Sequence, residues 1–320
     1  MMDTQTTDHK ARSLPLTEYA ADLARSGMPI LPGGPGTFWA GFASGTMMRR
    51  PAFHLAPPTS HEIRQVLWRG RTAIASYLLE PDERHLANAW LYVCTDRTYA
   101  LEKLSQQMRR NVRLGLKHLT ITPLTSEQVL AHGVQAFCDT QRRVGLSEGT
   151  PERFRRRFIS VASLPEYVYL GAWKDNQLAA FLSIIEVDDW AEIEGTFSMD
   201  ALRRYKPNDT LMYSALSYYL VERACRLMSY GVSSIQAESN AAGLHRFKTK
   251  VGFEARPVHR AFVPHPLLRP FVNRLTLWGV NTALRLWPGD LNLKRAGGML
   301  AYMLGNTHLL EATARSTSDE

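Results

Sequence analysis

The stretch from residue 232 to residue 253 constrains the fold more than any other part of the sequence. Residues 232–238 (VSSIQAE) are apolar or β-branched at alternate places, which predicts a short strand. Asn240 belongs to the residue types that cap helices. The apolar residues that follow at helical spacing are Leu244, Phe247 and Val251. Gly252 adopts the left-handed conformation easily, so the sequence predicts a strand, a short capped helix and a Gly-Phe stop.

This order resembles the GNAT superfamily of N-acyltransferases, whose corresponding segment is usually written N-x-x-A-x-x-L-Y-x-K-x-G-F. Phe247 and Lys248 stand where that pattern has Leu-Tyr. The F-K-x-x-x-G-F version is similar to the FemAB-like branch, which transfers acyl or aminoacyl groups to amines. The resemblance covers residues 101–257 and implies an α/β fold with a GNAT-type mixed, largely antiparallel sheet flanked by helices. FemAB-like proteins often contain two such halves, so residues 37–101 are expected to form a degenerate first half.

Composition adds a bias toward anionic partners. The formal net charge is +8, which favours association with nucleotides, phospholipids or nucleic acid. The three cysteines are widely spaced and form no CxxC pair, which argues against a disulfide or a zinc cluster and favours a reducing cytoplasm. The first residues are polar, and no apolar run is long and charge-free enough to span a bilayer. We therefore expect a cytoplasmic protein without a metal cofactor.

Four segments are expected along the chain. They are a disordered N-terminus (1–13), an N-terminal partial GNAT-like half (14–100), a catalytic GNAT-like domain (101–263) and an amphipathic helical tail with a disordered end (264–320).

Periodicity and turn residues predict the elements between these limits. In the N-terminal half they are a helix over 14–26 and strands at FWAGFASG, AFHLAP, QVLWRG, TAIASYLLE and AWLYVCT. In the catalytic half they are helices over 99–118, 124–145 (stopped by Gly145) and 151–163 (capped by Thr150), strands over 167–173, 177–187 and 190–198, and a helix over 210–229 that ends at Gly231. The strands at 190–198 and 232–238 are expected to be parallel, joined by a right-handed helical crossover.

The resemblance implies a donor site at the helix that follows the third of these strands. There the donor's pyrophosphate binds backbone N–H groups at the helix N-terminus. The usual fingerprint is Q/R-x-x-G-x-G/A, of which this chain keeps Arg204 but neither glycine. The residues assigned to an acyl-CoA (acetyl-CoA) co-substrate are Arg204, Lys206, Asn208, Asp209, Thr210, Leu211 and Asn240.

Acyl transfer to an amine also needs a group that accepts the amine's proton. Glu192, Glu194 and Thr196 alternate along the third strand, so they are expected to share one face. We assign the base to Glu194, with Glu238, at the end of the strand 232–238, as a second candidate.

Two residues of the 239–250 helix complete the predicted site. Lys248 replaces the tyrosine that many GNAT enzymes use as an acid, and its ammonium could stabilise an oxyanion or hold a phosphate or carboxylate, or it could be a surface lysine. His245 lies one turn back, where it could shuttle a proton or be an ordinary, partly buried histidine. The acceptor is assigned to Arg110 and Arg113, on the basic face of the 99–118 helix, and to Glu192 and Ser239.

The tail contains a second amphipathic pattern. Residues 270–287 place an apolar side opposite spaced arginines, and Trp278 and Trp287 would suit a helix lying in a membrane interface. Peripheral membrane contact through 264–305, packing onto the domain and packing onto a second subunit in a homodimer all remain open.

These features predict an N-acyltransferase that moves an acyl group from acyl-CoA to an amine of an amino sugar, an amino acid or a lipid-linked acceptor in envelope, polysaccharide or lipid biosynthesis. An aminoacyl-tRNA-dependent FemAB-like enzyme is an alternative that the arginine-rich helix 151–163 favours and the missing tRNA-binding insertion disfavours. A non-catalytic GNAT-shaped protein that binds a nucleotide or an anionic lipid is the third.

Overall fold

The computed structural model describes residues 14–43, 45–81, 87–144, 149–234, 239–287 and 290–305. The predicted N-terminal tail, the helix stop at Gly145, Glu238 and the end of the chain after residue 305 lie outside these residues.

The chain divides into two compact units, which are described one at a time. Of the described residues, unit 1 contains Leu114–Met228, Asp96–Tyr99 and residues 14–22. Unit 2 contains Leu23–Thr95, Ala100–Arg113 and residues 229–305, within the same described ranges. The helix α1 (Leu16–Arg25) agrees with the helix predicted over 14–26.

The sheet of unit 1 has the strand order β9-β8-β7-β6, with antiparallel pairing throughout. Its strands are β6 (Thr120–Leu124), β7 (Tyr167–Lys174), β8 (Gln177–Val187) and β9 (Trp190–Ser198). Asp175 and Asp188 turn the chain between them with φ angles of 54° and 46°, a left-handed conformation that aspartate tolerates better than most residues. The predicted three-strand meander over 167–198 is confirmed.

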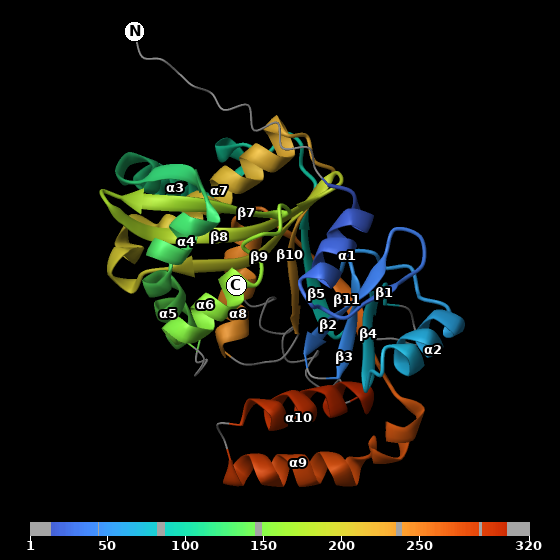
Figure 1. Cartoon of the computed structure of the whole chain (residues 1–320). Coiled ribbons are helices and arrows are strands. Elements are labelled where there is room, and N and C mark those ends of the chain that lie inside the picture. Colours follow the sequence, from blue (N-terminus) through green and yellow to red (C-terminus); the bar gives the residue numbers. More distant parts are fainter. Residues whose placement is uncertain are drawn as a thin grey trace. The chain divides into compact units, whose positions relative to one another are not determined.

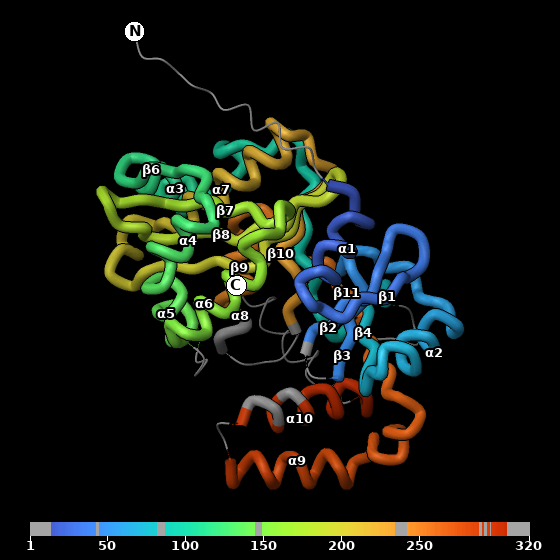
Figure 2. Tube along the Cα trace, viewed as in Figure 1, coloured from blue at the N-terminus to red at the C-terminus, as the bar shows by residue number. Residues whose placement is uncertain are grey.

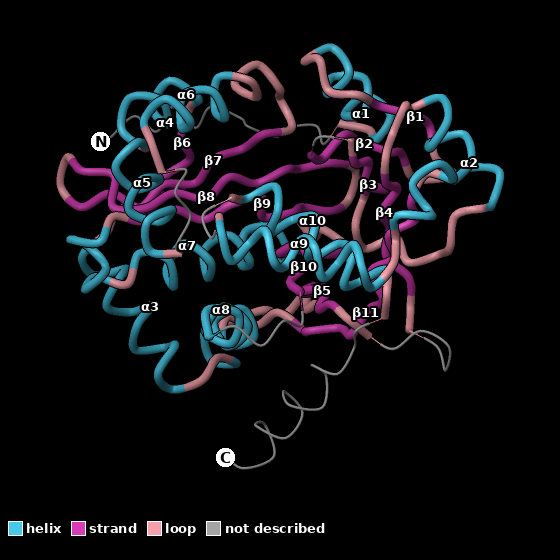
Figure 3. The backbone as a smooth tube through the Cα atoms, turned by 90° about the horizontal axis from the view of Figure 1, so that it is seen from below, coloured by secondary structure: helices cyan, strands magenta, loops and turns pink. Residues whose placement is uncertain are grey.

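Three helices cover one face of this sheet, as Figures 1 and 3 show. They are α4 (Ser126–His132), α5 (Val134–Arg143) and α6 (Pro151–Ile159). The aromatic core under them consists of Phe137, Phe154, Phe158, Tyr169, Phe181 and Phe197. Thr150 caps α6 by accepting from the N–H of Arg153, as predicted, whereas the helix predicted over 124–145 is divided at Gly133.

On the opposite face lies α7 (Pro207–Leu216) (Figure 3). The last turns of α3 (Gln106–His118), which replaces most of the helix predicted over 99–118, pack against it. At the crossing, a Cβ on Gly115 would lie 1.7 Å from Oγ1 of Thr210. Only a residue without a side chain permits this approach of the two backbones.

The predicted helix over 210–229 is wrong beyond its first turns. The α-helix ends at Leu216, Ser217–Glu222 form a π-helical turn, and β10 (Leu227–Ser234) follows. In the π-helical turn Tyr219 bonds the carboxylate of Glu186, and Arg223 pairs with the same carboxylate just after it. The continuous apolar run fits a buried helix and a buried strand equally well, so periodicity could not separate them.

The sheet of unit 2 has the strand order β1-β2-β3-β4-β11-β5-β10. Its strands are β1 (Ile30–Pro32), β2 (Phe38–Ala43), β3 (Thr46–Arg50), β4 (Ile74–Leu79), β5 (Ala89–Cys94), β10 and β11 (Glu254–Pro264). β3 and β4 are parallel, and β11 runs antiparallel to both of its neighbours. Figure 2 shows this orange strand between two strands from the first third of the chain.

The helices of unit 2 are α2 (Ser60–Arg69), α8 (Ser239–Lys250), α9 (Arg274–Leu286) and α10 (Leu291–Met303). QVLWRG, predicted as a strand, lies in α2, because Thr59 accepts from the N–H of Glu62 and starts a helix whose Val66 and Leu67 are buried. AFHLAP is not a strand either; β3 precedes it. The predicted helix and glycine stop around α8 are confirmed, with Gly252 at φ 110°. Both units have the predicted mixed, largely antiparallel architecture flanked by helices.

The contact between α3 and α7 gives a stability prediction. Gly115→Ala is expected to lower the free energy of unfolding by roughly 1–3 kcal/mol, because the new methyl group overlaps Thr210 in a packed crossing. Gly279→Ala in α9 is the matched control, since nothing lies within 4 Å of the added Cβ. That variant should be more stable by up to about 1 kcal/mol. Denaturant unfolding of both variants measures the change in the free energy of unfolding. Equal changes for the two substitutions would contradict the close packing of α3 against α7.

Candidate functional site

The N-terminus of α7 is where the donor was predicted to bind. Its cap, Lys206, has the left-handed conformation (φ 58°, ψ 43°), and Pro207 is the first helical residue. The side-chain amide of Asn208 donates to Oγ of Ser198 at the end of β9, over 3.1 Å. This bond ties the start of the helix to the end of the third strand, as the predicted donor site requires.

The backbone at this helix end offers few donors. Pro207 has no N–H, and the N–H of Thr210 donates to the carbonyl oxygen of Lys206. Neither Pro207 nor Thr210 therefore has a backbone N–H available to an anion here, which leaves a larger part to the cationic side chains before them. The side chains of Thr210 and Leu211 are fully buried, so neither can contact a ligand. Of the ligand contacts predicted for Thr210 and Leu211, only those through the backbone remain possible.

Aromatic and cationic side chains gather just before α7. The guanidinium of Arg204 lies 4.9 Å from the ring centre of Tyr205 and donates to its hydroxyl over 3.1 Å. The ring of His118 and the ammonium of Lys174 lie 5.4 and 5.8 Å from the same ring centre. Because the cationic side chains of Arg204 and Lys174 lie beside this ring, this end of unit 1 favours an anionic ligand.

The predicted base Glu194 lies at a bulge in β9. Ser183 is opposite Gly195 and Ile184 is opposite Ile193, so Glu194 has no partner across the strand pair. The extra residue shifts the alternation of side chains. The prediction that Glu192, Glu194 and Thr196 share one face is therefore wrong.

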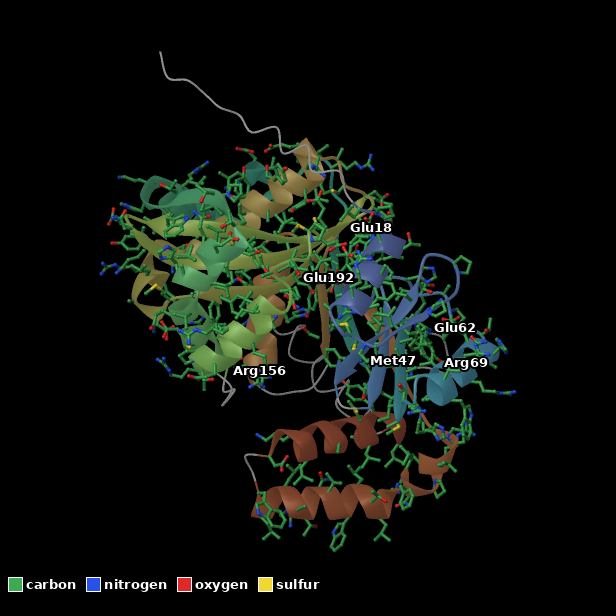
Figure 4. All side chains as sticks on the ribbon, in the orientation of Figure 1. Glu18, Met47, Glu62, Arg69, Arg156 and Glu192 are labelled. Carbon is green, nitrogen blue, oxygen red and sulfur yellow. The ribbon has the colours of Figure 1, made fainter. Side chains whose placement is uncertain are left out.

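Two neighbours fix the carboxylate of Glu194. Oγ of Ser183 donates to it over 3.0 Å, and the guanidinium of Arg157 pairs with it at 3.1 Å. Arg157 also lies over the ring of Phe197, 5.4 Å from its centre. The side chain of Glu194 keeps 30% of its area exposed, whereas Glu192, labelled in Figure 4, is 6% exposed. Of the two carboxylates, that of Glu194 is the more exposed.

Some buried polar atoms of unit 1 have no hydrogen-bond partner in the described part of the chain. Among them are Oη of Tyr169, Oγ1 of Thr196 and Oδ1 of Asn208. Burial and the negative charge of Glu194 raise the pKa of Tyr169, which keeps its phenol protonated. A buried atom without a partner costs free energy unless water or a ligand supplies the bond. The residue pattern gave no reason to single out Tyr169 or Ser183, and Arg157 stood out only as part of the arginine-rich helix 151–163, not as a partner of Glu194.

In unit 2, Lys248 is buried rather than exposed to a cleft. Its side chain is 4% exposed, and its ammonium donates to the carbonyl oxygen of Tyr230 over 2.9 Å and to Oγ of Ser233 over 3.2 Å. The ammonium also lies 4.1 Å from the ring centre of Tyr92 and 4.4 Å from that of Tyr230. These contacts hold α8 against β10 and β5.

His245 belongs to the same cluster, which the sequence joined to Lys248 but not to the tyrosines. Its Nδ1 lies 2.9 Å from the hydroxyl of Tyr92, and its ring is 5.5 Å from that of Trp90. Burial and the charge of Lys248 lower the pKa of His245. The imidazole is therefore neutral at physiological pH and can accept or donate one hydrogen bond to the phenol.

The remaining predicted residues contribute less. Arg110 and Arg113 are exposed on α3, and the side chains of Ser239 and Asn240 lie outside the described part of the chain, as does Glu238. The helix α8 begins at Ser239, one residue before the predicted cap. Among the described residues, no group of three histidine, cysteine or carboxylate side chains could hold a metal ion.

This architecture is similar to that of other proteins of known structure. No family model and no curated protein matches the sequence. FemX, a solved structure, is similar with a TM-score of 0.54 at 10% sequence identity, over 80% of this chain and 93% of FemX. The C-terminal domain (DUF2156) of a protein named as a lysylphosphatidylglycerol synthetase of Agrobacterium fabrum gives a TM-score of 0.52 at 17% identity, over 76% of this chain and 87% of that one.

The chain therefore has the GNAT-type fold, as the motif around α8 predicted. Within that fold its likeness is to FemX and to the DUF2156 domain, so the resemblance to the FemAB-like branch is confirmed at the level of the fold.

The contacts of Lys248 predict a stability effect. Lys248→Met is expected to lower the free energy of unfolding by roughly 1–3 kcal/mol, because the substitution leaves two buried acceptors without their donor. Lys250→Met on the exposed side of α8 is the control and should stay within about 0.5 kcal/mol of wild type. An unchanged midpoint of denaturant unfolding for Lys248→Met would contradict the structural role.

The lowered pKa of His245 predicts a pH dependence. A histidine whose pKa is lower in the folded state binds protons more readily when unfolded, so its contribution to stability is present above the ordinary histidine pKa, near 6.5. Stability is expected to fall as pH drops below that value. His245→Gln should flatten this part of the pH profile of the unfolding midpoint. Identical profiles for wild type and His245→Gln would refute the assignment.

Proposed function

We propose that this chain is an N-acyltransferase that moves an acyl group from acyl-CoA to a primary amine. The observation that supports this most directly is the start of α7, where a left-handed Lys206 and the Asn208–Ser198 bond set a helix N-terminus at the end of the third strand. A helix N-terminus attracts phosphate through its N–H groups and its dipole. Lys206 and Arg204 add positive charge where the donor's pyrophosphate would bind.

The chemistry requires one bond to form and one to break. The amine nitrogen attacks the thioester carbonyl, the C–S bond breaks from the tetrahedral intermediate, and CoA leaves as a thiol. The attacking amine loses a proton, which we assign to the carboxylate of Glu194 and, from there, to the leaving sulfur. Ser183 and Arg157 hold this carboxylate in place, which supports its selection over Glu192. Glu238 remains a second proposal for the base.

For Lys248 the contacts support a positioning role. Its ammonium is already bonded to Tyr230 and Ser233, and its exposure is 4%. A side chain so enclosed can fix the orientation of the C-terminal part of α8, the helix that carries His245. Stabilisation of an oxyanion by Lys248, predicted from the motif, would require the side chain to leave these partners.

We place the reaction in the cytoplasm and take the acceptor to be the amine of an amino sugar, an amino acid or a lipid-linked molecule of the cell envelope. The basic face of α3 suits an acidic acceptor, with Arg110 and Arg113 as its proposed contacts. The fold of the DUF2156 domain, whose parent protein is named for a lipid product, is compatible with the lipid-linked choice.

A second candidate function uses an aminoacyl-tRNA as the donor. The fold likeness to FemX favours it, since the FemAB-like branch includes the transfer of aminoacyl groups. The exposed Arg155 and Arg156 on α6 would contact the RNA backbone, and such binding would be strongly salt-dependent.

Thermal unfolding with a panel of acyl-CoAs tests the first proposal. Acetyl-CoA or a longer acyl-CoA at 100 times its dissociation constant should stabilise the chain by about 2.7 kcal/mol. Lys206→Glu should remove most of this stabilisation, and Lys250→Glu, which is exposed elsewhere, should not. Glu194→Gln should keep donor binding but lower kcat by roughly 10²–10⁴.

Two outcomes would redirect the assignment. Stabilisation by charged tRNA but by no acyl-CoA would replace the first function with the second. Neither donor stabilising the chain would contradict both.

A further inference from the structure

Unit 2 exposes an unusual number of large apolar side chains in its C-terminal part. Six residues of the 3₁₀ turn Pro266–Phe271, of α9 and of the residue after it are 61–74% exposed. We call them the tail surface; they are Leu267, Phe271, Leu275, Trp278, Leu286 and Trp287. Single exposed apolar residues are normal on a soluble protein, but a cluster of this kind marks an interaction site.

The helix α9 has two opposite apolar faces. At 100° per residue, Leu275, Trp278 and Leu286 point about 180° away from Leu277, Val280 and Leu284. The second group faces α10, where Val280 and Leu284 lie within 4 Å of a Cβ built on Gly297. Because the inner face is already packed, the outer apolar face is not needed for folding of the hairpin.

The hairpin of α9 and α10 is held firmly within unit 2. The hydroxyl of Tyr302 on α10 donates to the carbonyl oxygen of Asn88 over 3.3 Å, and its ring lies 5.4 Å from that of Phe262 on β11. Figure 1 shows α10 between α9 and the strands of unit 2, and Figure 4 shows side chains of α9 projecting away from α10. The tail surface is therefore presented outward by a packed layer.

The net charge of residues 264–305 indicates which kind of partner the tail surface binds. Residues 264–305 contain five lysines and arginines and one aspartate, a net charge of +4. Arg274 and Arg285 are both exposed, at the two ends of α9. Two copies of this surface facing each other would bring these arginines together, which disfavours a dimer through it. A surface that combines negative charge with an apolar interior satisfies both features.

We propose that the tail surface docks onto an anionic phospholipid bilayer, with α9 lying in the plane of the interface. Trp278 and Trp287 are suited to the boundary between head groups and acyl chains, because each ring is apolar but carries an N–H. A 13-residue helix is about 20 Å long, shorter than the ~30 Å hydrocarbon core, which excludes a spanning orientation for α9. More generally, no helix in the described ranges is long and apolar enough to cross a membrane.

The geometry makes membrane contact independent of the donor proposed above. Leu275, Trp278 and Leu286 would enter the acyl boundary while Arg274 and Arg285 contact lipid phosphates. An acceptor that is itself lipid-linked would then be met at the surface where it resides, rather than by diffusion through the cytoplasm.

Co-sedimentation of the full chain with vesicles tests the proposal. The chain should bind vesicles that mix phosphatidylglycerol with phosphatidylcholine and bind phosphatidylcholine alone much more weakly. The double variant Leu275→Gln, Leu286→Gln should reduce partitioning at least ~tenfold, and Arg274→Gln, Arg285→Gln should reduce it about fivefold per arginine. The matched controls are Phe42→Gln with Ile159→Gln, and Arg155→Gln with Arg156→Gln, which are exposed elsewhere and should bind like wild type.

A second measurement does not depend on these variants. Brominated acyl chains should quench part of the tryptophan fluorescence, and replacing Trp278 and Trp287 by phenylalanine should remove that quenching. Absent binding to the anionic vesicles, or equal losses in the controls, would overturn the proposal. So would a change from dimer to monomer in Leu275→Gln, Leu286→Gln by analytical ultracentrifugation, because a second copy would then cover the tail surface.

Discussion

The buried ammonium of Lys248 is the interaction on which the strand–helix part of unit 2 depends. An ammonium that leaves water must regain its hydrogen bonds, and here a carbonyl oxygen, a hydroxyl and two aromatic faces replace the solvent. Tyr230 and Ser233 come from β10, Tyr92 from β5 and Lys248 from α8, so one charge joins three elements. Burial and, next to it, the same charge lower the pKa of His245, which favours the neutral imidazole beside Tyr92. The segment 239–253, which predicted the fold, thus also joins α8 to β10 and β5 through the side chain of Lys248.

The corresponding feature of unit 1 is a partly exposed carboxylate, that of Glu194, which lies beside an aromatic core. The bulge at Glu194 turns this residue out of the strand ladder, and Ser183 and Arg157 then hold it. Arg157 can approach because its guanidinium stacks over Phe197 instead of competing with the apolar side chains. The start of α7 is fixed independently through Ser198. The carboxylate of Glu194 on β9 and the start of α7 therefore belong to the same unit, separated in the chain by the 3₁₀ helix Asp200–Tyr205.

The sequence correctly predicted the elements that depend on interactions between residues only a few positions apart. The hairpins of β7, β8 and β9, the capped helix α6 and the Gly252 stop follow from turn residues, caps and alternation within a few positions. The predictions were wrong where one residue pattern fits both a helix and a strand. The apolar run after Leu216 forms a π-helical turn and then a strand, not one long helix. The segment QVLWRG lies in a helix capped by Thr59, not in a strand. The candidate site was foreseen only in part. Glu194 and Lys248 were visible by type and motif, whereas Tyr169, Arg157 and Tyr92 acquire meaning only through contacts between residues distant in sequence.

Strand β11 has a consequence for how the chain reaches its native state. It pairs with β4 and β5 on either side, so that His259 is matched with Leu79 and Val258 with Ala89. The early strands of unit 2 must therefore wait for residues that leave the ribosome much later, while unit 1 has most of its sheet in one continuous stretch. Loop closure over such separations is slow relative to hairpin formation. During synthesis β4 and β5 would each expose the edge that later pairs with β11, and such unpaired edges are prone to aggregation until β11 arrives.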